Sequence, residues 1–326
     1  MGNPVFSVIV PVYNQDAYVE ECVNSVLLQN FPEVELLLVN DGSNDRSAEI
    51  LDRIYEEHPN EIRVIHQENR GVFEARHAGF DAASGSYVLF LDADDRLSPE
   101  SLSVLNGEIR KNQPDLILFE MTTNRSLSDH DKSLPFQNGE IIADKRKLFQ
   151  LMGSGYLLNH MGIKCIKRTL ITEEAFSHPK DLRLSFAEDL YLTIPVVAGA
   201  SRVEYLDQKL YFYRDNEEGA TYRYDRDMYL AMIETVNRLR HYAGEEVASN
   251  YAGLECYNIA TKVFRSSMSF GEKRRELRFI KDHPFYRQYG VNSIRMKTGY
   301  RKVLAHLFRS DSLPAAGLLE LLYRFF

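Results

Sequence analysis

Short apolar runs alternate with helical patterns through the first part of the chain. Uninterrupted apolar runs are typical of strands buried on both faces, and apolar residues recurring every three or four positions indicate amphipathic helices. The predicted strands cover residues 6–12, 34–39, 62–65, 87–91 and 116–119. The predicted helices between them span residues 19–27, 51–55, 72–83 and 102–109. This alternation predicts an α/β fold with a mostly parallel sheet and helices on both faces.

The pattern changes beyond the fifth predicted strand. Residues 122–140 are polar and predict a loop, whereas the stretch up to residue 215 mixes a helix near 148–151 with strands near 162–166 and 209–213. Beyond about residue 223 the spacing of apolar residues is almost entirely helical. We therefore expect two domains, an α/β domain over 1–215 and a helical C-terminal region over 216–326. The helical region is expected to make acceptor, oligomer or membrane-surface contacts.

Composition and charge narrow the class of protein. The chain has 326 residues, of which 44% are hydrophobic and 26% charged, as in globular proteins. Its net charge of −8 argues against nucleic acid as a partner. Cys22, Cys165 and Cys256 lie far apart without C-x-x-C spacing, so we expect buried reduced thiols rather than disulfides or a zinc site. The start of the sequence has no basic region, and no apolar run is long enough to span a bilayer, which favours a cytoplasmic location.

An acidic cluster follows the fourth predicted strand directly. Asp92, Asp94 and Asp95 crowd three carboxylates into four positions, where they repel one another and lose water if partly buried. A hard divalent cation with oxygen ligands removes both costs. The alternative is a simple strand-to-helix turn, because Ser98, Pro99 and Glu100 have the residue types of a helix start.

The other predicted strands also end in polar residues. Ligands of open parallel sheets bind outside the carboxyl ends of the strands, so these groups should converge on one edge. The polar segments are residues 13–16, 40–43, 67–71 and 92–95. The first turn has neither G-x-G-x-x-G nor G-x-x-x-x-G-K-[ST], which disfavours a dinucleotide-binding site and a P-loop. It also lacks the glycine-rich basic loop that a sugar nucleotidyltransferase would use to hold a triphosphate.

Taken together, the segments resemble the successive motifs of family 2 glycosyltransferases, which are inverting enzymes with the GT-A fold. The matching segments are Ser7 to Asn14, Val39 to Asp45, Asn69 to Gly71, Ala75-Arg76 and Gly85 to Asp95. Farther along, Phe186 to Asp189 resembles the E-D motif of this family, and Tyr213 to Thr221 resembles the segment that follows it. The resemblance places the chain among enzymes of bacterial glycan assembly. The C-terminal helices resemble no family motif.

The resemblance implies a donor site for the nucleotide of a UDP-sugar. Its expected members are Pro11, Tyr13, Asn14, Asp41, Arg76 and Asp92. Tyr13 would stack on the base, Asp41 would accept the uracil N–H, and Arg76 would lie by the base or the diphosphate. Each of these residues also has a purely structural alternative. Tyr13 would be a core aromatic at a strand end, Asp41 a turn residue, and Arg76 a solvated arginine on a helix. His77 stands where the family usually has Asn, which leaves the local hydrogen bonding open.

The resemblance also implies a metal site and a base. Asp94, with Asp92, would bind Mn²⁺ or Mg²⁺ against the diphosphate, and Asp95 would support them or begin a helix. Asp189 would take the proton from the acceptor hydroxyl, and Glu188 would raise the pKa of Asp189 by repulsion and orient the acceptor. An exposed acidic helix start is the alternative for this pair.

Lys164 and Arg214 are the candidate cations for contacts with the acceptor or the phosphates. The alternative is that each is an ordinary charged residue of the surface. The chain has no Trp, so it lacks the Q-x-x-R-W motif that processive synthases of the family use. We therefore expect a non-processive enzyme that moves a hexosyl or N-acetylhexosaminyl group to a glycan or lipid-linked glycan. A nucleotidyltransferase and a non-catalytic nucleotide- or glycan-binding module are the competing hypotheses.

The last segment combines basic and apolar residues. Residues 290–326 contain six Lys or Arg against two Asp or Glu, in a chain whose total charge is −8. Apolar residues at helical spacing beside basic ones favour contact with anionic lipid. This pattern predicts peripheral binding of residues 300–326 to the inner face of the membrane. Packing in the protein's own core or in a homodimer interface is the alternative.

Overall fold

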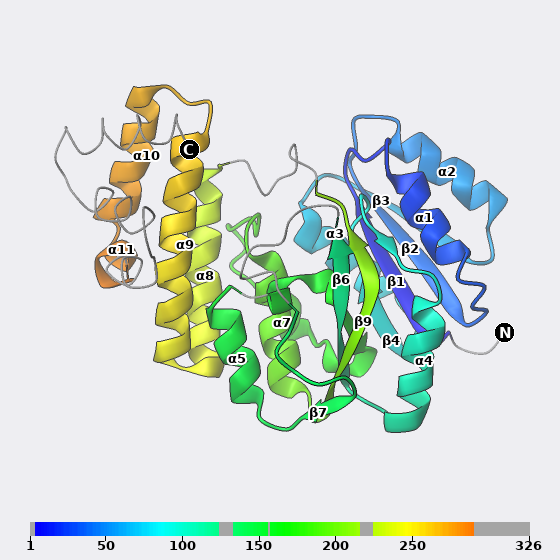
Figure 1. Ribbon diagram of the computed structural model, residues 1–326. Coiled ribbons are helices and arrows are strands. Elements are labelled where there is room, and N and C mark those ends of the chain that lie inside the picture. Colours follow the sequence, from blue (N-terminus) through cyan, green and yellow to red (C-terminus); the bar gives the residue numbers. More distant parts are fainter. Residues whose placement is uncertain (1–3, 124–132, 156, 216–223, 290–326) are drawn as a thin grey trace. The chain divides into compact units, whose positions relative to one another are not determined.

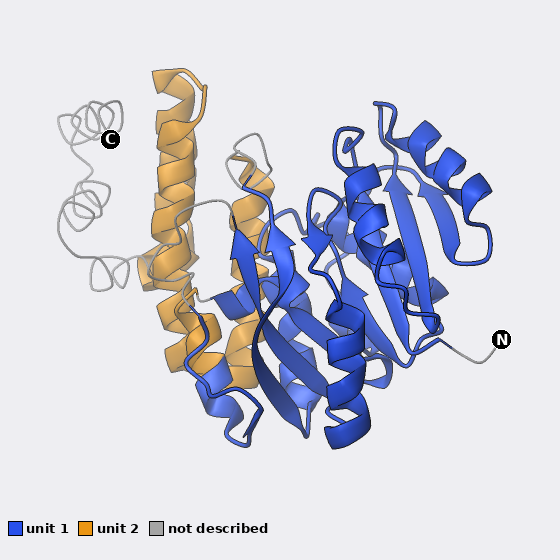
Figure 2. Cartoon of the chain, turned by 45° about the vertical axis from the view of Figure 1, so that its right-hand side comes forward, with its two compact units in different colours: residues 1–148, 156–215 blue, residues 149–155, 216–326 orange. Residues whose placement is uncertain are grey.

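The computed structural model describes residues 4–123, 133–155, 157–215 and 224–289 (Figure 1). The chain divides into two compact units, one of residues 1–148 and 156–215 and the other of residues 149–155 and 216–326 (Figure 2). The expected tail contact over 300–326 and the predicted segment 219–221 lie outside the described residues.

The first unit contains the sheet. Its strands are β1 (Phe6–Val12), β2 (Val34–Asp41), β3 (Ile62–Gln67), β4 (Tyr87–Phe90), β5 (Arg96–Leu97), β6 (Leu116–Thr123), β7 (Glu140–Ile142), β8 (Lys164–Lys167) and β9 (Val203–Tyr213). Its α-helices are α1 (Val19–Leu27), α2 (Ser47–Glu57), α3 (Val72–Ala82), α4 (Ser101–Asn112), α6 (Glu173–Phe176) and α7 (Glu188–Gly199). Helix α5 (Lys145–Gly153) contains a boundary between the units, and short 3₁₀ turns cover 157–159, 161–163 and 168–170.

The strands form one mixed sheet in the order β3-β2-β1-β4-β8-β6-β9-β5, with β7 paired to β9 (Figure 1). Strands β3, β2, β1 and β4 are parallel, whereas β8 runs antiparallel to both of its neighbours, β4 and β6. The order reverses at β1, because β2 and β4 lie on its two sides. The sheet with its flanking helices confirms the predicted fold class.

This reversal of strand order creates the crevice where a ligand of an open sheet binds. Right-handed crossovers then place α1 and α2 on one face of the sheet and α3 on the other. Helix α3 packs tightly against β1 and β2, since a Cβ at Gly79 would come within 2.4 Å of Ile9 and 3.2 Å of Val39. The same helix carries Arg76, so its close packing fixes a candidate donor-site residue against the sheet.

One predicted helix start is wrong. The structure begins α4 at Ser101, and its preceding residue Glu100 has a left-handed φ of 63°. Ser98 instead donates its backbone N–H to the Leu210 carbonyl, next to the short strand β5. Ser98 is therefore tied to β9 and is not the N-cap of α4. Asp95 consequently does not begin a helix.

The second unit is helical, with α8 (Arg226–Ala243), α9 (Glu245–Arg265), α10 (Phe270–Asp282) and α11 (Pro284–Tyr289). Helix α8 buries Met228, Met232, Val236 and Leu239, whereas Ile233 at the same helical spacing is only partly buried. Gly244 joins α8 to α9 with a φ of 88°, and Ser269 with Glu272 forms a capping box on α10. None of the helices in the described part of the chain is long and apolar enough to cross a membrane. The three cysteines are buried free thiols, as predicted.

Candidate active site

The acidic turn lies directly after β4, at the carboxyl edge of the sheet. The Leu91 N–H donates to the Ile9 carbonyl at 3.0 Å, which extends the pairing of β4 with β1 to the start of the turn. The Asp95 N–H donates to the Asp92 carbonyl at 2.9 Å and closes the turn. Asp92 and Asp94 are partly exposed, whereas Asp95 is buried.

Asp95 supports this turn from inside. Its two carboxylate oxygens accept hydrogen bonds from the Tyr211 hydroxyl at 2.5 Å and from the Arg214 backbone N–H at 2.7 Å. Burial, followed by the charges of Asp92 and Asp94, raises the pKa of Asp95 to about 8. Carboxylate oxygens are the ligands that a hard divalent cation prefers, so the donor set of the turn suits Mg²⁺ or Mn²⁺.

Arg76 joins the acidic turn to the E-D segment. Its guanidinium lies 2.9 Å from Asp92, 2.5 Å from Asp189 and 3.7 Å from Glu188, and its side chain is only 3% exposed. Burial alone would lower the pKa of Arg76, but Asp189, Asp92 and Glu188 outweigh burial and raise it. Arg76 is therefore a buried cation shared by carboxylates, and the alternative of a solvated helix arginine is wrong.

The two acids of the E-D segment have different surroundings. They begin α7, and Asp189 accepts hydrogen bonds from Arg76 on one oxygen and from the Met161 N–H on the other, the latter at 2.9 Å. Although burial opposes the effect, Arg76 and then the Met161 N–H lower the pKa of Asp189. Burial and then the charge of Asp189 raise the pKa of Glu188 to about 7. The expectation that Glu188 raises the pKa of Asp189 is thus wrong, because the bound guanidinium outweighs the like charge.

The segments after β1 and β2 are tied together beside the turn. Asn14 has a left-handed φ of 54°, its amide oxygen accepts from the Asn44 N–H at 2.8 Å, and its N–H donates to the Ser43 hydroxyl at 3.1 Å. Pro11 is buried within β1. Tyr13 is 44% exposed, so it is not a core residue and its ring is available for stacking.

Asp41 is buried and holds the loop after β3. One oxygen accepts from the Gln67 amide and the Arg70 N–H, and the other accepts from the Gly71 N–H, all at 2.8 Å. Asp41 is only 2% exposed to solvent. A carboxylate has about four lone-pair sites, so three donors leave one for a ligand. The structure therefore gives Asp41 a structural role, with one lone-pair site that these three donors do not use.

The two candidate cations lie in different places. Lys164 begins β8, has no exposed surface and donates to the His160 carbonyl. Burial lowers the pKa of Lys164 to about 7, although the charge of Asp189 acts in the opposite direction. Arg214 follows β9 and donates from Nε to the Asp94 carbonyl at 2.8 Å and from Nη2 to Glu21 at 2.5 Å. In this structure both side chains are engaged by the protein itself.

Two contacts of the site have no local signal in the sequence. Tyr211 lies inside a strand, yet its hydroxyl binds Asp95 and also accepts from the Asp92 N–H at 3.3 Å. The Met161 backbone fixes Asp189 across a separation of 28 residues. Only tertiary contacts between segments distant in sequence bring these groups to the acidic residues.

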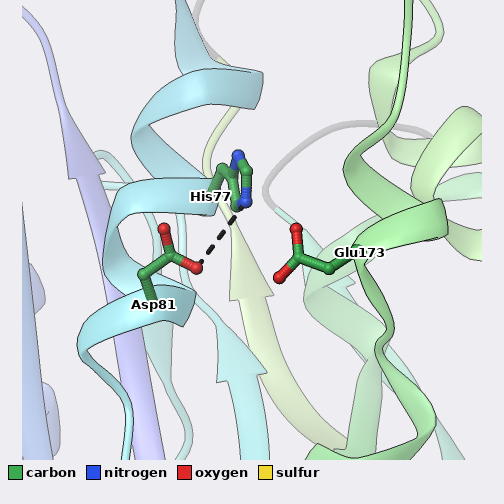
Figure 3. A group of neighbouring side chains, drawn as sticks. All are labelled: His77, Asp81 and Glu173. Atoms are coloured by element: carbon green, nitrogen blue, oxygen red, sulfur yellow. Dashed lines mark ion pairs between the residues drawn. The ribbon is translucent and has the colours of Figure 1, made fainter.

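A second group of potential ligands lies on α3 and α6, away from the acidic turn. His77, Asp81 and Glu173 place one ligand atom each within 4.8 Å of one another (Figure 3). The His77 ring stacks on Phe176 at 4.3 Å, and Asp81 lies 3.6 Å from the imidazole with its side chain 62% exposed. Water can solvate carboxylates this exposed, so the group needs no ion for its stability.

Comparison with known proteins places these motifs in a known sequence family. The Glycosyl transferase family 2 model matches residues 7–176. The uncharacterized glycosyltransferase EpsJ of Bacillus subtilis is 34% identical over 222 residues, which are 67% of this chain and 63% of EpsJ. The match thus spans less than two thirds of the length of that relative. A poly(ribitol-phosphate) β-N-acetylglucosaminyltransferase, TarS of Staphylococcus aureus, is 27% identical over 66% of this chain and 36% of its own length.

Solved structures agree on the fold. Residues 1–349 of S. aureus TarS in complex with UDP superpose with a TM-score of 0.66 at 20% identity, covering 98% of this chain and 91% of that one. The same TarS fragment with UDP-GlcNAc gives a TM-score of 0.62 at 22% identity, with the same coverage. The mannosyltransferase PcManGT of Pyrobaculum calidifontis, in complex with GDP-Man and Mn²⁺, gives 0.55 at 14% identity, covering 98% and 88% of the two chains.

Proposed function

Because this chain belongs to the Glycosyl transferase family 2, we propose that it moves a sugar from a UDP-sugar to a hydroxyl group of a glycan, free or carried on a lipid. The reaction is non-processive and inverts the anomeric centre. The observation that supports this proposal most directly is the position of Arg76. Its guanidinium binds both Asp92 of the candidate donor site and Asp189 of the candidate acceptor side, so the two sides belong to one hydrogen-bonded cluster. A single displacement requires the leaving diphosphate and the proton acceptor to be held at one site, and the connection of Asp92 to Asp189 through Arg76 supports that arrangement.

The proposed donor side consists of residues at the carboxyl ends of the parallel strands β1 and β2. Tyr13 stacks on the uracil, Asp41 offers its remaining acceptor site to the base, and Asn14 with Pro11 shapes the pocket. The UDP complexes of the TarS neighbour make UDP-sugars the first donors to test, and UDP-GlcNAc is the first among them.

Asp94 and Asp92 are the proposed ligands of Mn²⁺ or Mg²⁺, with Asp95 behind them. A divalent ion bound there would neutralise the charge that develops on the leaving diphosphate. Three carboxylates within four positions at the carboxyl edge of the sheet support this proposal, and the Mn²⁺ complex of PcManGT makes Mn²⁺ the first ion to test.

The Glu188–Asp189 pair is the proposed proton acceptor for the attacking hydroxyl. Asp189 is the member that the family motif assigns, and Arg76 with the Met161 N–H fixes its orientation. Glu188 has the pKa nearer to 7, which suits proton transfer at neutral pH. The two acids interact strongly, so an observed pKa belongs to the pair.

A donor screen tests the proposal. The full-length protein is incubated with single UDP-sugars and Mn²⁺, and release of UDP is measured with and without EDTA. One UDP-sugar should be hydrolysed slowly without acceptor, and EDTA should stop the reaction. Pyrophosphate release from UTP and a sugar 1-phosphate would instead identify a nucleotidyltransferase. Absence of turnover with every donor and acceptor would favour a binding module.

A further inference from the structure

The end of β9 contacts the acidic turn at three of its four positions. The Tyr211 hydroxyl donates to Asp95 and accepts from the Asp92 N–H, at 2.5 and 3.3 Å. Just beyond the strand, Arg214 donates from its backbone N–H to Asp95 at 2.7 Å and from its side-chain Nε to the Asp94 carbonyl at 2.8 Å. The shape of the turn therefore depends on a residue more than a hundred positions away in the chain.

The Arg214 side chain is itself held from the opposite side. Nη2 donates to Glu21 of α1 at 2.5 Å, and the guanidinium lies 4.8 Å from the centre of the Tyr18 ring. A planar guanidinium presents its donors in a fixed fork, so these contacts set the direction of the Nε–H that reaches Asp94. Arg214 thus links α1 to the backbone of the turn.

An arginine beside a cation site is unfavourable by charge alone. Its positive charge repels a bound divalent ion, so electrostatics would select against it at this position. Its bond to the Asp94 carbonyl acts differently, because it holds the backbone of a turn whose three carboxylates repel one another. A ligand turn held in one shape binds its ion without first being ordered.

We propose that Arg214 is a positioning residue for the divalent cation, holding the Asp94 backbone so that the carboxylates of the turn are set for the ion. The inference rests on the proposed metal site at Asp92 and Asp94. It assigns Arg214 to the geometry of that site instead of to the acceptor or the phosphates.

The chain provides a matched control in Arg96. Arg96 pairs with the other oxygen of the Glu21 carboxylate, and its guanidinium lies 4.1 Å from the Phe212 ring. Arg96 has the same charge and the same acidic partner as Arg214. The two differ in that Arg214 donates a hydrogen bond to the Asp94 carbonyl. Removing either arginine takes one positive charge away from Glu21, but of the two only Arg214 donates to the Asp94 carbonyl.

The experiment measures Mn²⁺ affinity by calorimetry and by electron paramagnetic resonance, without any turnover assay. Wild-type protein is compared with Arg214→Ala, Arg214→Lys, Arg96→Ala and Asp94→Asn, and UDP binding in EDTA with thermal unfolding reports whether each variant is folded. Changes in groups that orient metal ligands cost roughly 10- to 100-fold in affinity. We expect that loss in Arg214→Ala, a smaller loss in Arg214→Lys, and affinity equal to or tighter than wild type in Arg96→Ala.

The direction of the change distinguishes positioning from charge. If Arg214→Ala binds Mn²⁺ as tightly as wild type, or more tightly, the positioning role is wrong while the metal site stands. Equal weakening in Arg96→Ala would also overturn it. If wild-type protein binds no Mn²⁺, or Asp94→Asn binds it unchanged, the metal site itself fails and the inference with it. Should the alanine variant unfold, Arg214→Lys decides by the same criterion.

Discussion

The guanidinium of Arg76 donates to the carboxylate of Asp189 at 2.5 Å, although 113 residues separate the two in the chain. The second terminal nitrogen of Arg76 binds Asp92 at 2.9 Å. One buried cation therefore connects a residue after β4 with the start of α7. This connection makes the proposed donor and acceptor sides a single structural unit.

Loss of Arg76 should destabilise the fold and stop transfer. Removing one partner of a buried ion pair costs roughly 3–5 kcal/mol, and we expect Arg76→Met to lie near the low end because the acids are partly exposed. Arg76→Lys should also lose transfer, since an ammonium cannot bind two carboxylates in fork geometry. Urea unfolding and UDP release measure the two effects.

An exposed arginine supplies the control for Arg76. Arg46 lies 3.5 Å from Asp16 with its side chain 77% exposed, so Arg46→Ala should change stability by less than about 1 kcal/mol. If Arg76→Met and Arg46→Ala lower the free energy of unfolding equally, the buried ion pairs of Arg76 stabilise the fold no more than an exposed pair does.

The E-D pair should impose a pH dependence on transfer. Asp189, with its lowered pKa, is already charged at lower pH, so the raised pKa of Glu188, about 7, means that the pair gains its second negative charge as pH rises through that value. The rate should therefore increase with pH through about 7 and then level off. Asp189→Asn should keep UDP binding and lose at least ~10²-fold in rate, the low end for a positioned proton acceptor.

Glu188→Gln separates the two acids. If Glu188 carries the rise near pH 7, the glutamine variant should lose that limb of the profile. A variant that retains the same limb would assign the titration to another group. Loss of UDP binding in Asp189→Asn, with turnover spared, would move Asp189 to the donor site.

Asp94→Asn should abolish transfer while leaving the fold intact. The substitution removes a proposed ligand oxygen's charge and keeps the size of the side chain. Calorimetric titration with Mn²⁺ and thermal unfolding are the measurements. Full turnover in this variant, or full activity of wild-type protein in EDTA, would refute metal dependence.

The donor site should prefer uridine nucleotides. The remaining acceptor site of Asp41 can receive the N3–H of uracil, whereas cytosine has no proton at that position. UDP should therefore bind the wild-type protein more tightly than CDP or GDP by calorimetry. Wild-type protein is the right test, because changing Asp41 would also remove three internal hydrogen bonds. Equal affinities would contradict the assignment.

The tail gives a prediction from sequence alone. Full-length protein should co-sediment with anionic vesicles at low salt, while protein ending at Gly299 should not, because the removed residues are rich in basic and apolar side chains. Neutral vesicles and high salt are the controls. If both proteins remain in the supernatant with anionic vesicles, the tail has a structural or dimerising role.

Local pattern in the sequence determined the elements and the motif positions. Apolar runs and helical spacing are set by neighbouring residues, so β1 to β4 and the helices between them could be predicted, as could the acidic turn at the end of β4. The family motifs follow one another along the chain, and their order needs no tertiary information.

The tertiary structure decided what these residues contact. Periodicity does not reveal which strands pair, so neither the antiparallel β8 beside β4 nor the return of β9 beside β6 could be predicted. Those pairings bring Tyr211 and Arg214 to the acidic turn, and α7 brings Asp189 to Arg76. The lowered pKa of Asp189 and the hydrogen bond of Ser98 to β9 follow from the same cause, because partners distant in sequence outweigh the local preference.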